Sequence, residues 1–475
     1  MKSMTLDILI GGMPRGGTTV AAKLMSLHPD IFCYAGETHL IPFMYSMFSH
    51  LPCRPDKVEL VTRYLRHQFM TAMVEMPRFS VSQGAHPRNL IFNEQTVNDL
   101  IEAVRSHLNA GLYGEALYKA SLTTMAEMLS IVDARNIRGE KTPSNIFAMA
   151  EYAEVNAARN VIVIREPIGV LRSMKARVDG GDSYSAVFRG DLEATIGMYL
   201  EYAMAVQRVL SSSPSGFMIR YEDMALNPAQ LMRDIFRCYG SEPEDRVIRF
   251  VEKGGDKEIA DRAPMNYRRL ALSADYGDLS PVDIWKIFAL TREVRNAVGY
   301  SDETMESWGF KIPSDWPDVD VPSAVLPLYG FHQKGLIGGP LMKRHGGLIV
   351  YVPRGSSYDL VLTLKSTFPD QAETGVNLSV TVNSNARDII TVESGRRVTY
   401  ITLAIHKDDL IPMGNRGGYA IIDLKSSLSY CKIGHEAHGD DAREVSFTLD
   451  HWKLNRRPSR WRQLFGIISQ KGTTN

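Results

Sequence analysis

Residues 8–19 read Ile8-Leu9-Ile10-Gly11-Gly12-Met13-Pro14-Arg15-Gly16-Gly17-Thr18-Thr19. The apolar residues 6–10 predict a buried strand, and the spacing of residues 20–27 predicts an amphipathic helix. Glycine lets the backbone between them approach an anion, and the N–H groups at the start of a helix point toward it. The stretch therefore predicts a strand, an anion-binding loop and a helix. A glycine turn that serves only close packing is the alternative.

The positive charge of this loop comes from an unusual place. From Gly12 the spacing Gly-x-x-x-x-Gly-Thr-Thr is that of a nucleoside triphosphatase loop, but Thr18 stands where such loops carry a lysine. Arg15 lies inside the loop instead, and its planar guanidinium suits a tetrahedral oxyanion. The loop is therefore better suited to another phosphate ester than to a triphosphate with magnesium.

A second anion site is predicted after the apolar residues 161–164. Arg165 follows this run, at the carboxyl end of a predicted parallel strand, where open α/β sheets bind ligands. Ser173 comes eight residues later, and Arg177 lies four residues after it on the same face of the predicted helix. The two arginine sites together favour a ligand with two phosphate groups.

Length and composition indicate a globular protein of two domains. The 475 residues exceed the roughly 250 to 300 at which a single core stops growing. Apolar residues make up 44% and charged residues 23%, while 54 basic and 54 acidic residues give zero net charge. Nothing in this balance favours nucleic acid as a partner, so any basic site must be local.

The chain carries no sign of a membrane or an oxidising compartment. Residues 1–6 lead directly into the first predicted strand, which leaves no room for a secretory signal, and no run of about 18 apolar residues predicts a membrane span. Cys33, Cys53, Cys238 and Cys431 lack Cys-x-x-Cys spacing and offer no metal framework. We therefore expect a cytoplasmic protein.

The first 312 residues predict a P-loop-like α/β fold, a parallel sheet flanked by helices. Apolar runs at 161–164 and 217–219 alternate with helical patterns at 57–76, 97–110, 192–209 and 229–239. Residues 313–325 are proline-rich and predict an extended linker. The predicted first domain is therefore residues 1–312.

Residues 326–455 predict an antiparallel β-sandwich. Period-two alternation marks strands at 346–352, 358–364, 376–382, 398–403 and 419–424. Tyr329, Phe331 and Trp452 are candidates for stacking on sugars, or else for core packing. The basic tail 456–475 predicts a short helix that docks on the protein, frays or meets a lipid surface.

Two phosphate sites without the triphosphate lysine resemble the sulfotransferases that use 3'-phosphoadenylyl sulfate (PAPS). The resemblance spans about residues 6–310 and implies the sulfotransferase fold, with PAPS as donor and no metal. Arg165 and Ser173 look like the family's 3'-phosphate pair, since arginine with serine eight residues on is the family spacing. The family's 5'-phosphosulfate loop corresponds to Pro14, Arg15, Gly16, Gly17, Thr18 and Thr19.

Within that family the chain is most similar to the tyrosylprotein sulfotransferase branch and its bacterial relatives, because His28-Pro29-Asp30 leads into Gly36-Glu37-Thr38-His39. In that branch the glutamate is the catalytic base, and the resemblance carries this role to Glu37. It also implies further contacts with the donor and the leaving group at Lys141, Arg177, Tyr221 and Ser273. Residues 272–300 look like the family's closing helix.

Two departures limit what the resemblance implies about the acceptor. His39 stands where the tyrosylprotein branch has arginine, which argues against an acidic peptide around tyrosine. The glycine-rich terminal clamp of cytosolic steroid and phenol sulfotransferases is also missing. His39 is then a second base, an acceptor contact or a structural histidine. The appended β-sandwich suggests, by analogy alone, a carbohydrate or glycolipid acceptor.

Sulfuryl transfer needs a base for the acceptor hydroxyl and cations around the sulfonate and the leaving phosphate. We expect Glu37 to be the base, with its pKa raised by partial burial, and Arg15, Lys141 and Ser273 to stabilise the developing charge. Each residue also has a plain structural alternative: Glu37 as a helix cap, Lys141 as a partner of Glu140 or of a neighbouring acid at the surface, or Tyr221 as core packing.

The sequence therefore predicts a PAPS-dependent sulfotransferase that modifies a hydroxyl group, with a homodimer left open. Two other functions remain as alternatives. An ATP-dependent small-molecule or sugar kinase would need the missing loop lysine. A non-catalytic glycan-binding protein with a degenerate transferase domain would bind donor without turnover.

Overall fold

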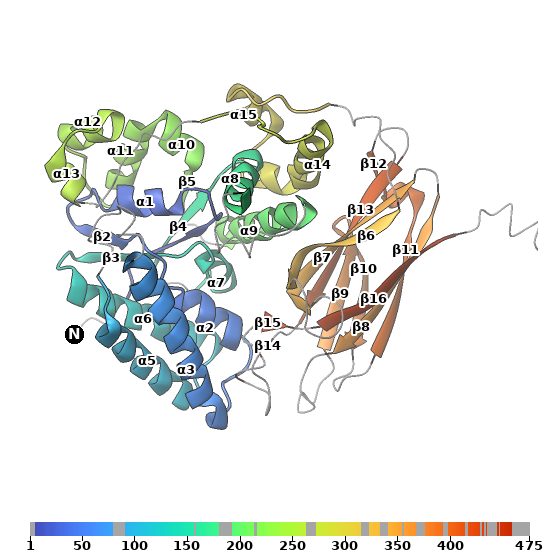
Figure 1. The fold of residues 1–475 in the computed structure, drawn as a ribbon, viewed down its shortest axis with the longest axis horizontal. Helices are drawn as coiled ribbons and strands as arrows, with labels where there is room; N and C mark the ends of the chain where they lie inside the picture. Colours follow the sequence, from blue (N-terminus) through green and yellow to red (C-terminus); the bar gives the residue numbers. More distant parts are fainter. Residues whose placement is uncertain are drawn as a thin grey trace, which may run out of the picture. The chain divides into compact units, whose positions relative to one another are not determined.

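The computed structural model describes residues 5–78, 91–155, 158–179, 192–212, 216–262, 272–314, 323–332, 341–353, 356–366, 376–392, 398–413, 417–427, 430–431, 434, 444–445 and 447–457. The chain forms two compact units (Figure 1). The first comprises Met1–Gly190, Tyr199–Ile312 and Tyr430–Arg443, and the second comprises Asp191–Met198, Pro313–Ser429 and Glu444–Asn475.

A five-stranded sheet lies at the centre of the first unit. Its strands are β1 (Ile8–Gly12), β2 (Ile31–Tyr34), β3 (Ile137–Lys141), β4 (Arg159–Ile164) and β5 (Phe217–Arg220). They are all parallel, in the order β2-β3-β1-β4-β5. Parallel neighbours that are not consecutive in sequence require helical crossovers, and the helices supply them. The predicted parallel sheet flanked by helices is confirmed.

Helices cover both faces of this sheet (Figure 1). The helices of the described residues are α1 (Thr18–Met25), α2 (Leu40–Phe48), α3 (Val58–Phe69), α5 (Glu94–Asn109), α6 (Gly114–Val132), α7 (Asn145–Glu151), α8 (Pro167–Asp179), α9 (Leu192–Ser212), α10 (Tyr221–Leu226), α11 (Pro228–Cys238), α12 (Asp245–Lys253), α13 (Lys257–Arg262), α14 (Pro281–Ala297) and α15 (Asp302–Ser307). Short helical turns lie at Pro55–Lys57 and Met70–Glu75. On one face, apolar side chains of β1 and β4 share a buried core with α1, α11 and α12.

The first strand and helix are displaced by two residues from their predicted positions. β1 continues through Gly11 and Gly12, which pair with Ile162 and Val163 of β4. A Cβ on Gly12 would lie 1.9 Å from the carbonyl oxygen of Val163, so only glycine permits this close pairing. β3 was not predicted as a strand, because three of its five residues are charged and they break the apolar pattern.

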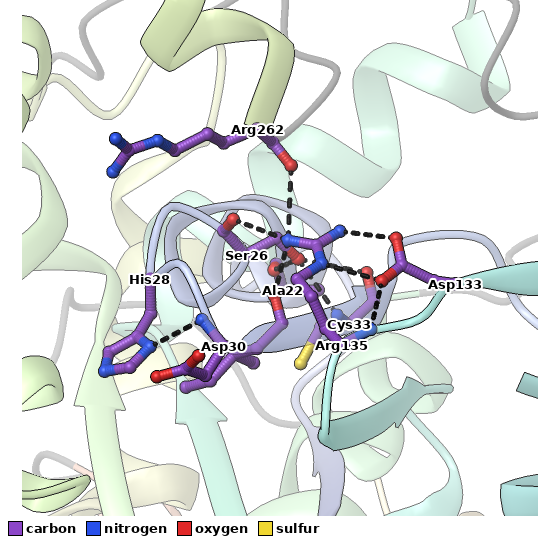
Figure 2. Close-up of polar contacts among 9 residues, drawn as sticks. Ala22, Ser26, His28, Asp30, Cys33, Asp133, Arg135 and Arg262 are labelled. Atoms are coloured by element: carbon purple, nitrogen blue, oxygen red, sulfur yellow. Dashed lines mark hydrogen bonds and ion pairs between the residues drawn. The ribbon is translucent and has the colours of Figure 1, made fainter. Parts of the chain in front are cut away.

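Arg135 fixes the connection between α1 and β2 (Figure 2). Its guanidinium donates to the carbonyl oxygens of Ser26 at 3.1 Å and Ile31 at 2.6 Å, and it pairs with the carboxylate of Asp133. In the same connection the Nδ1 atom of His28 accepts the N–H of Asp30 at 3.1 Å. The His28-Pro29-Asp30 motif is therefore part of a structural turn, on the side of the sheet opposite to the strand ends where ligands bind.

An antiparallel sheet of nine strands builds the second unit. Its order is β10-β9-β13-β7-β16-β8-β11, with β12 on β13 and β6 on β7. The bounds are β6 (Ala324–His332), β7 (Leu341–Pro353), β8 (Tyr358–Ser366), β9 (Val376–Val382), β10 (Asn385–Val392), β11 (Val398–Ile405), β12 (Ile411–Met413), β13 (Gly417–Ser426) and β16 (Phe447–Arg456). Two short strands, β14 (Tyr430–Cys431) and β15 (Glu444–Val445), and a helical turn at Lys407–Asp409 complete the elements.

The nine strands form the predicted sandwich. Among the described residues, β16 pairs with β7 at Phe447 and Thr448, and it pairs with β8 from Phe447 to Arg456. Alternate residues are buried on each layer, as at Leu360, Leu362 and Leu364 of β8. All five predicted strands are present, whereas β6, β10, β12 and β16 were not predicted.

Tyr329 belongs to the core of this unit. It is 5% exposed, and a Cβ on Gly347 would lie 2.4 Å from its ring, so it packs rather than presenting a free face to a sugar. Trp452 is half-buried, and its indole N–H donates to the carbonyl oxygen of Val325 at 3.1 Å. Core packing therefore accounts for these two aromatic residues.

Several predictions fall outside the described residues. The linker prediction covers 313–325, of which 315–322 are not described, and the tail prediction is described only at Arg456 and Arg457. The predicted domain limits stay predictions. Among the helices of the described ranges, none is both long and apolar enough to cross a bilayer.

Candidate functional site

The carboxyl ends of the five parallel strands each carry one of the predicted site residues. Glu37 follows β2, Lys141 is the last residue of β3, Arg15 follows β1, and Arg165 and Tyr221 come directly after β4 and β5. The sheet order β2-β3-β1-β4-β5 therefore places them along one edge in that sequence. This is the edge at which open α/β sheets bind ligands.

The loop between β1 and α1 leaves the start of α1 open. Gly17 is the N-cap residue, with φ 94°, and no side chain caps the helix. The first N–H groups of a helix have no partner within it, so those of Thr18 and Thr19 are available to an anion. Arg15 also has a positive φ, 64°, which turns the loop back on itself. In this loop Gly16 and Thr18 are buried, Pro14 is half-buried and Thr19 is exposed.

Arg15, Arg165, Ser173 and Tyr221 meet beside this loop. The Nε atom of Arg15 donates to the hydroxyl of Ser173 at 2.9 Å, and Nη1 of Arg165 lies 3.5 Å from the carbonyl oxygen of Arg15. The Arg165 guanidinium stacks 3.9 Å from the centre of the Tyr221 ring. Tyr221 is half-buried, and this cation–π contact gives it a role besides core packing.

A cavity of about 410 Å³ opens next to this cluster. It is lined by Arg165, Gly169, Arg172, Ser173, Lys175, Ala176, Asp179, Ser273, Tyr276, Asp278 and Leu279. Ser273 is exposed, and its hydroxyl accepts the N–H of Asp275 at 3.4 Å. The cavity thus brings Ser273 to the same side as Arg165 and Ser173.

Glu37 and Lys141 form an ion pair in the second part of the site. Nζ of Lys141 donates to Oε1 of Glu37 at 2.7 Å, and Nε2 of His39 lies 3.5 Å from Oε2 of Glu37. The Lys141 side chain is 1% exposed, whereas that of Glu37 is 40% exposed. Lys141 therefore has Glu37, and not Glu140, as its partner, and the Glu37 carboxylate remains open to a ligand.

The expectation that burial raises the pKa of Glu37 is wrong. Burial acts in that direction, but the positive charges of Lys141 and Arg177, together with the neighbouring His39, outweigh it and lower the pKa. Glu37 is therefore ionised at neutral pH and ready to accept a proton. Arg177 is exposed on α8, and its charge contributes to lowering the pKa of Glu37.

His39, and not Glu37, is the N-cap residue of α2. It has φ 59°, and no side chain caps the helix. Its ring lies 5.9 Å from that of Phe43, and burial lowers its pKa despite the nearby carboxylate of Glu37. The helix-cap alternative for Glu37 is therefore wrong.

Sequence reasoning missed the role of Glu140, which connects the segment of Glu37 with the strand of Lys141. The Glu140 carboxylate is fully buried and accepts the hydroxyls of Thr38 at 2.9 Å and Thr142 at 2.6 Å, and the amide of Asn145 at 2.6 Å. Thr38 adjoins Glu37 in sequence, and Glu140 adjoins Lys141. Adjacent strand residues point to opposite faces, and the pattern alone does not say which of Glu140 and Lys141 faces the ligand.

The arrangement has two chemical capacities. Loop N–H groups, Arg15, Arg165 and Ser173 form a cationic, hydrogen-bonding surface for an anion with more than one charged group. Glu37 and Lys141 combine a proton acceptor with a cation beside it. Within the described residues, no three His, Cys, Asp or Glu side chains gather as ligands for a metal.

A family model described as "Sulfotransferase family" matches residues 7–245. The chain is similar to the sulfotransferase domain of the Synechococcus PCC 7002 olefin synthase, with 14% identity over 66% of this chain and 98% of that one, and a TM-score of 0.35. It is similar to sulfotransferase STF9 from Mycobacterium avium, with 14% identity over 65% and 78%, and a TM-score of 0.34.

A further similarity concerns a shorter part of the chain. A family 35 carbohydrate binding module from an environmental isolate matches with 13% identity over 30% of this chain and 96% of its own, at a TM-score of 0.17. No curated protein matches the chain.

Proposed function

We propose that this chain, which belongs to the sulfotransferase family, transfers the sulfuryl group of PAPS to a hydroxyl acceptor. The observation that carries the proposal is the cluster of Arg15, Arg165 and Ser173 beside the open start of α1, with the Glu37–Lys141 pair on the same edge of the sheet. The first group suits a ligand with two phosphate groups, and the second suits proton transfer.

The residues present fit such a donor. The loop N–H groups and Arg15 suit a 5'-phosphosulfate, because the helix start is uncapped and the glycines keep side chains out of the way. Arg165 and Ser173 suit a 3'-phosphate at the cavity of about 410 Å³. Thr18 is 5% exposed and gives no ammonium for a triphosphate, which disfavours the kinase alternative.

The donor supplies an activated sulfuryl group, and its sulfur–oxygen bond to the 5'-phosphate breaks as the bond from sulfur to the acceptor oxygen forms. Glu37 accepts the proton of the acceptor hydroxyl, since its lowered pKa keeps it ionised at neutral pH. Lys141 and Arg15 stabilise the negative charge that moves to the leaving phosphate oxygen. Together Glu37, Lys141 and Arg15 also argue against the degenerate, non-catalytic alternative.

We further propose that the chain lies near the tyrosylprotein branch and its bacterial relatives, and that its acceptor is a carbohydrate or glycolipid. Gly36-Glu37-Thr38 supports the first point, although His39 replaces the arginine of that branch. An exposed aromatic residue of the second unit, Tyr400, supports the second, since aromatic faces pack against sugar rings.

A calorimetric titration tests the donor assignment. We expect adenosine 3',5'-bisphosphate, the desulfated product, to bind with micromolar affinity, about 8 kcal/mol, in the absence of metal. Arg165→Ala should weaken this binding at least tenfold. Preference for ATP with magnesium, or equal bisphosphate affinity in wild type and Arg165→Ala, would contradict the proposal and return the kinase alternative.

A further inference from the structure

Three buried polar side chains that are linked to Arg165 have no part in the chemistry described above. Glu166 follows β4, Glu222 follows β5, and Tyr300 lies three residues after the end of α14; all three are 0% exposed. We infer that Tyr300, Glu222 and Glu166 form a positioning chain that holds Arg165 in place for the 3'-phosphate of the donor. The inference rests on the proposed function, because that function assigns Arg165 to the donor.

Glu222 connects the residues that follow β4 and β5 with the segment after α14. The Tyr300 hydroxyl donates to Oε2 of Glu222 at 2.7 Å, and Oε1 of Glu222 accepts the backbone N–H of Glu166 at 3.1 Å. One carboxylate therefore fixes both the residue that follows Arg165 and the helix turn that begins with Tyr221.

Glu166 extends the chain to the guanidinium. Both carboxylate oxygens accept the backbone N–H of Gly169 at 2.8 Å, and Oε1 lies 3.5 Å from Nε of Arg165. A Cβ on Gly169 would lie 2.0 Å from Oε1 of Glu166 and 2.5 Å from Nε of Arg165. The glycine therefore leaves just enough room for this pair.

Two further contacts hold Arg165, and one of them is made by a neighbour of Glu222. Its carbonyl oxygen accepts the hydroxyl of buried Tyr199 at 3.3 Å, and its guanidinium stacks on Tyr221, the residue next to Glu222. A free arginine side chain loses rotamer entropy when a ligand fixes it. Fixing Arg165 beforehand removes that cost from donor binding.

Stability alone gives no reason for these carboxylates. Two buried acids beside one arginine cost desolvation energy, and apolar residues of similar size would pack at least as favourably. Their arrangement along a line that ends at Arg165 fits a positioning role. The expected signature is a change in donor affinity with little change in turnover.

Tyr300→Phe tests the chain, because it removes only the hydroxyl. We expect about tenfold weaker binding of adenosine 3',5'-bisphosphate and a similar rise in KM for the donor, with kcat within twofold of wild type. Tyr118→Phe is the matched control: Tyr118 is 3% exposed on α6, and its hydroxyl has no hydrogen-bond partner in the described part of the chain. It should leave both constants unchanged.

The outcomes separate this inference from the proposed function. If wild type itself does not bind the bisphosphate, the proposed function is wrong. If wild type binds, Arg165→Ala weakens binding and Tyr300→Phe does not, the positioning chain is wrong and Tyr300 is a core residue. Should Tyr300→Phe fail to fold, Glu222→Gln serves instead. Glu222 accepts the two hydrogen bonds on different oxygens, and the amide replaces one of these oxygens with an NH2 group that cannot accept. The same rise in KM is then expected, and wild-type values would overturn the chain.

Discussion

At Glu37, the tertiary structure balances two opposing effects on one carboxylate. Burial favours the neutral acid, while Lys141 at 2.7 Å favours the carboxylate, and the cation prevails. Glu37 is therefore ionised near neutral pH, and its carboxylate is paired with the Lys141 ammonium. We expect its proton affinity to rise when Lys141 turns to an anionic ligand, because the opposing charge is then shared.

Glu37→Gln should separate binding from chemistry. Glutamine keeps the size of the side chain but cannot accept the proton, so kcat should fall by about 10² to 10⁴, with bisphosphate affinity near that of wild type. Glu94→Gln is the control, since Glu94 forms an ion pair of 2.7 Å with Arg66 at the surface, away from the strand ends. A Glu37→Gln enzyme with undiminished kcat would exclude Glu37 as the base.

Glu166 should make donor binding depend on pH. Burial, reinforced by the charge of Glu222, raises its pKa to about 8, although Arg165 opposes this shift. Below that pH Glu166 is neutral, and the positive charge of Arg165 attracts the ligand without opposition. Above that pH a Glu166 carboxylate lies 3.5 Å from Nε of Arg165 and partly neutralises this charge. Bisphosphate affinity measured by calorimetry should therefore fall between pH 7 and pH 9.

The same group should affect stability with a definite sign. The folded state holds the Glu166 proton more tightly than the unfolded chain does, so its contribution is present at acid pH and is lost as the pH rises from about 4.5 to about 8. Glu166→Gln, which cannot ionise, should abolish both effects. An unchanged slope in this variant would assign the pH dependence to another group.

Among the elements, α1 depends on the glycine at its start. Gly17 has φ 94°, and an added Cβ would lie 2.6 Å from Cε of Met224 and 3.1 Å from Cδ2 of Tyr221. Gly17→Ala should therefore push Tyr221 away from Arg165 and weaken bisphosphate binding at least tenfold. It should also lower the free energy of unfolding by about 1–3 kcal/mol through backbone strain.

Gly240→Ala is the matched control for this element. Gly240 has a positive φ of 74°, but nothing lies within 4 Å of its added Cβ. Thermal unfolding should therefore report strain in both variants, while calorimetry should report lost affinity only in Gly17→Ala. Equal affinity in the two variants would mean that the contact between loop and Tyr221 is not needed for binding.

At the scale of the whole molecule, the described part of the second unit carries an exposed aromatic residue, Tyr400. Tyr400 is 73% exposed on β11, at one edge of the sheet, opposite Thr363 of β8. Tyr400→Ala should weaken binding to neutral oligosaccharides about three- to tenfold, measured by calorimetry on the full chain. Ile389→Ala, at a 72% exposed site on the edge strand β10, is the control. Equal binding by Tyr400→Ala and wild type would remove the support that Tyr400 gives to a glycan acceptor.

Local pattern was enough to predict several elements of both units. The strands at 161–164 and 376–382 and the helix after the glycine loop follow from apolar spacing, which each segment carries by itself. β3 escaped prediction because Gly139, Glu140 and Lys141 give no such spacing. Its place between β2 and β1, with Lys141 buried, depends on neighbours more than 100 residues away in sequence.

The sequence by itself determined the alternation of strands and helices, the glycine loop, and the positions of Arg15 and Arg165 after strands, because these depend on residues close together in the chain. Only the tertiary structure decided that Lys141 pairs with Glu37, that Glu140 holds Thr38, and that Tyr300 reaches Glu222. The physical reason is that the sheet order brings together segments separated by 78 to 104 residues. Buried polar and charged groups must then find hydrogen-bond or ion-pair partners, and only the folded chain determines which groups are close enough to pair.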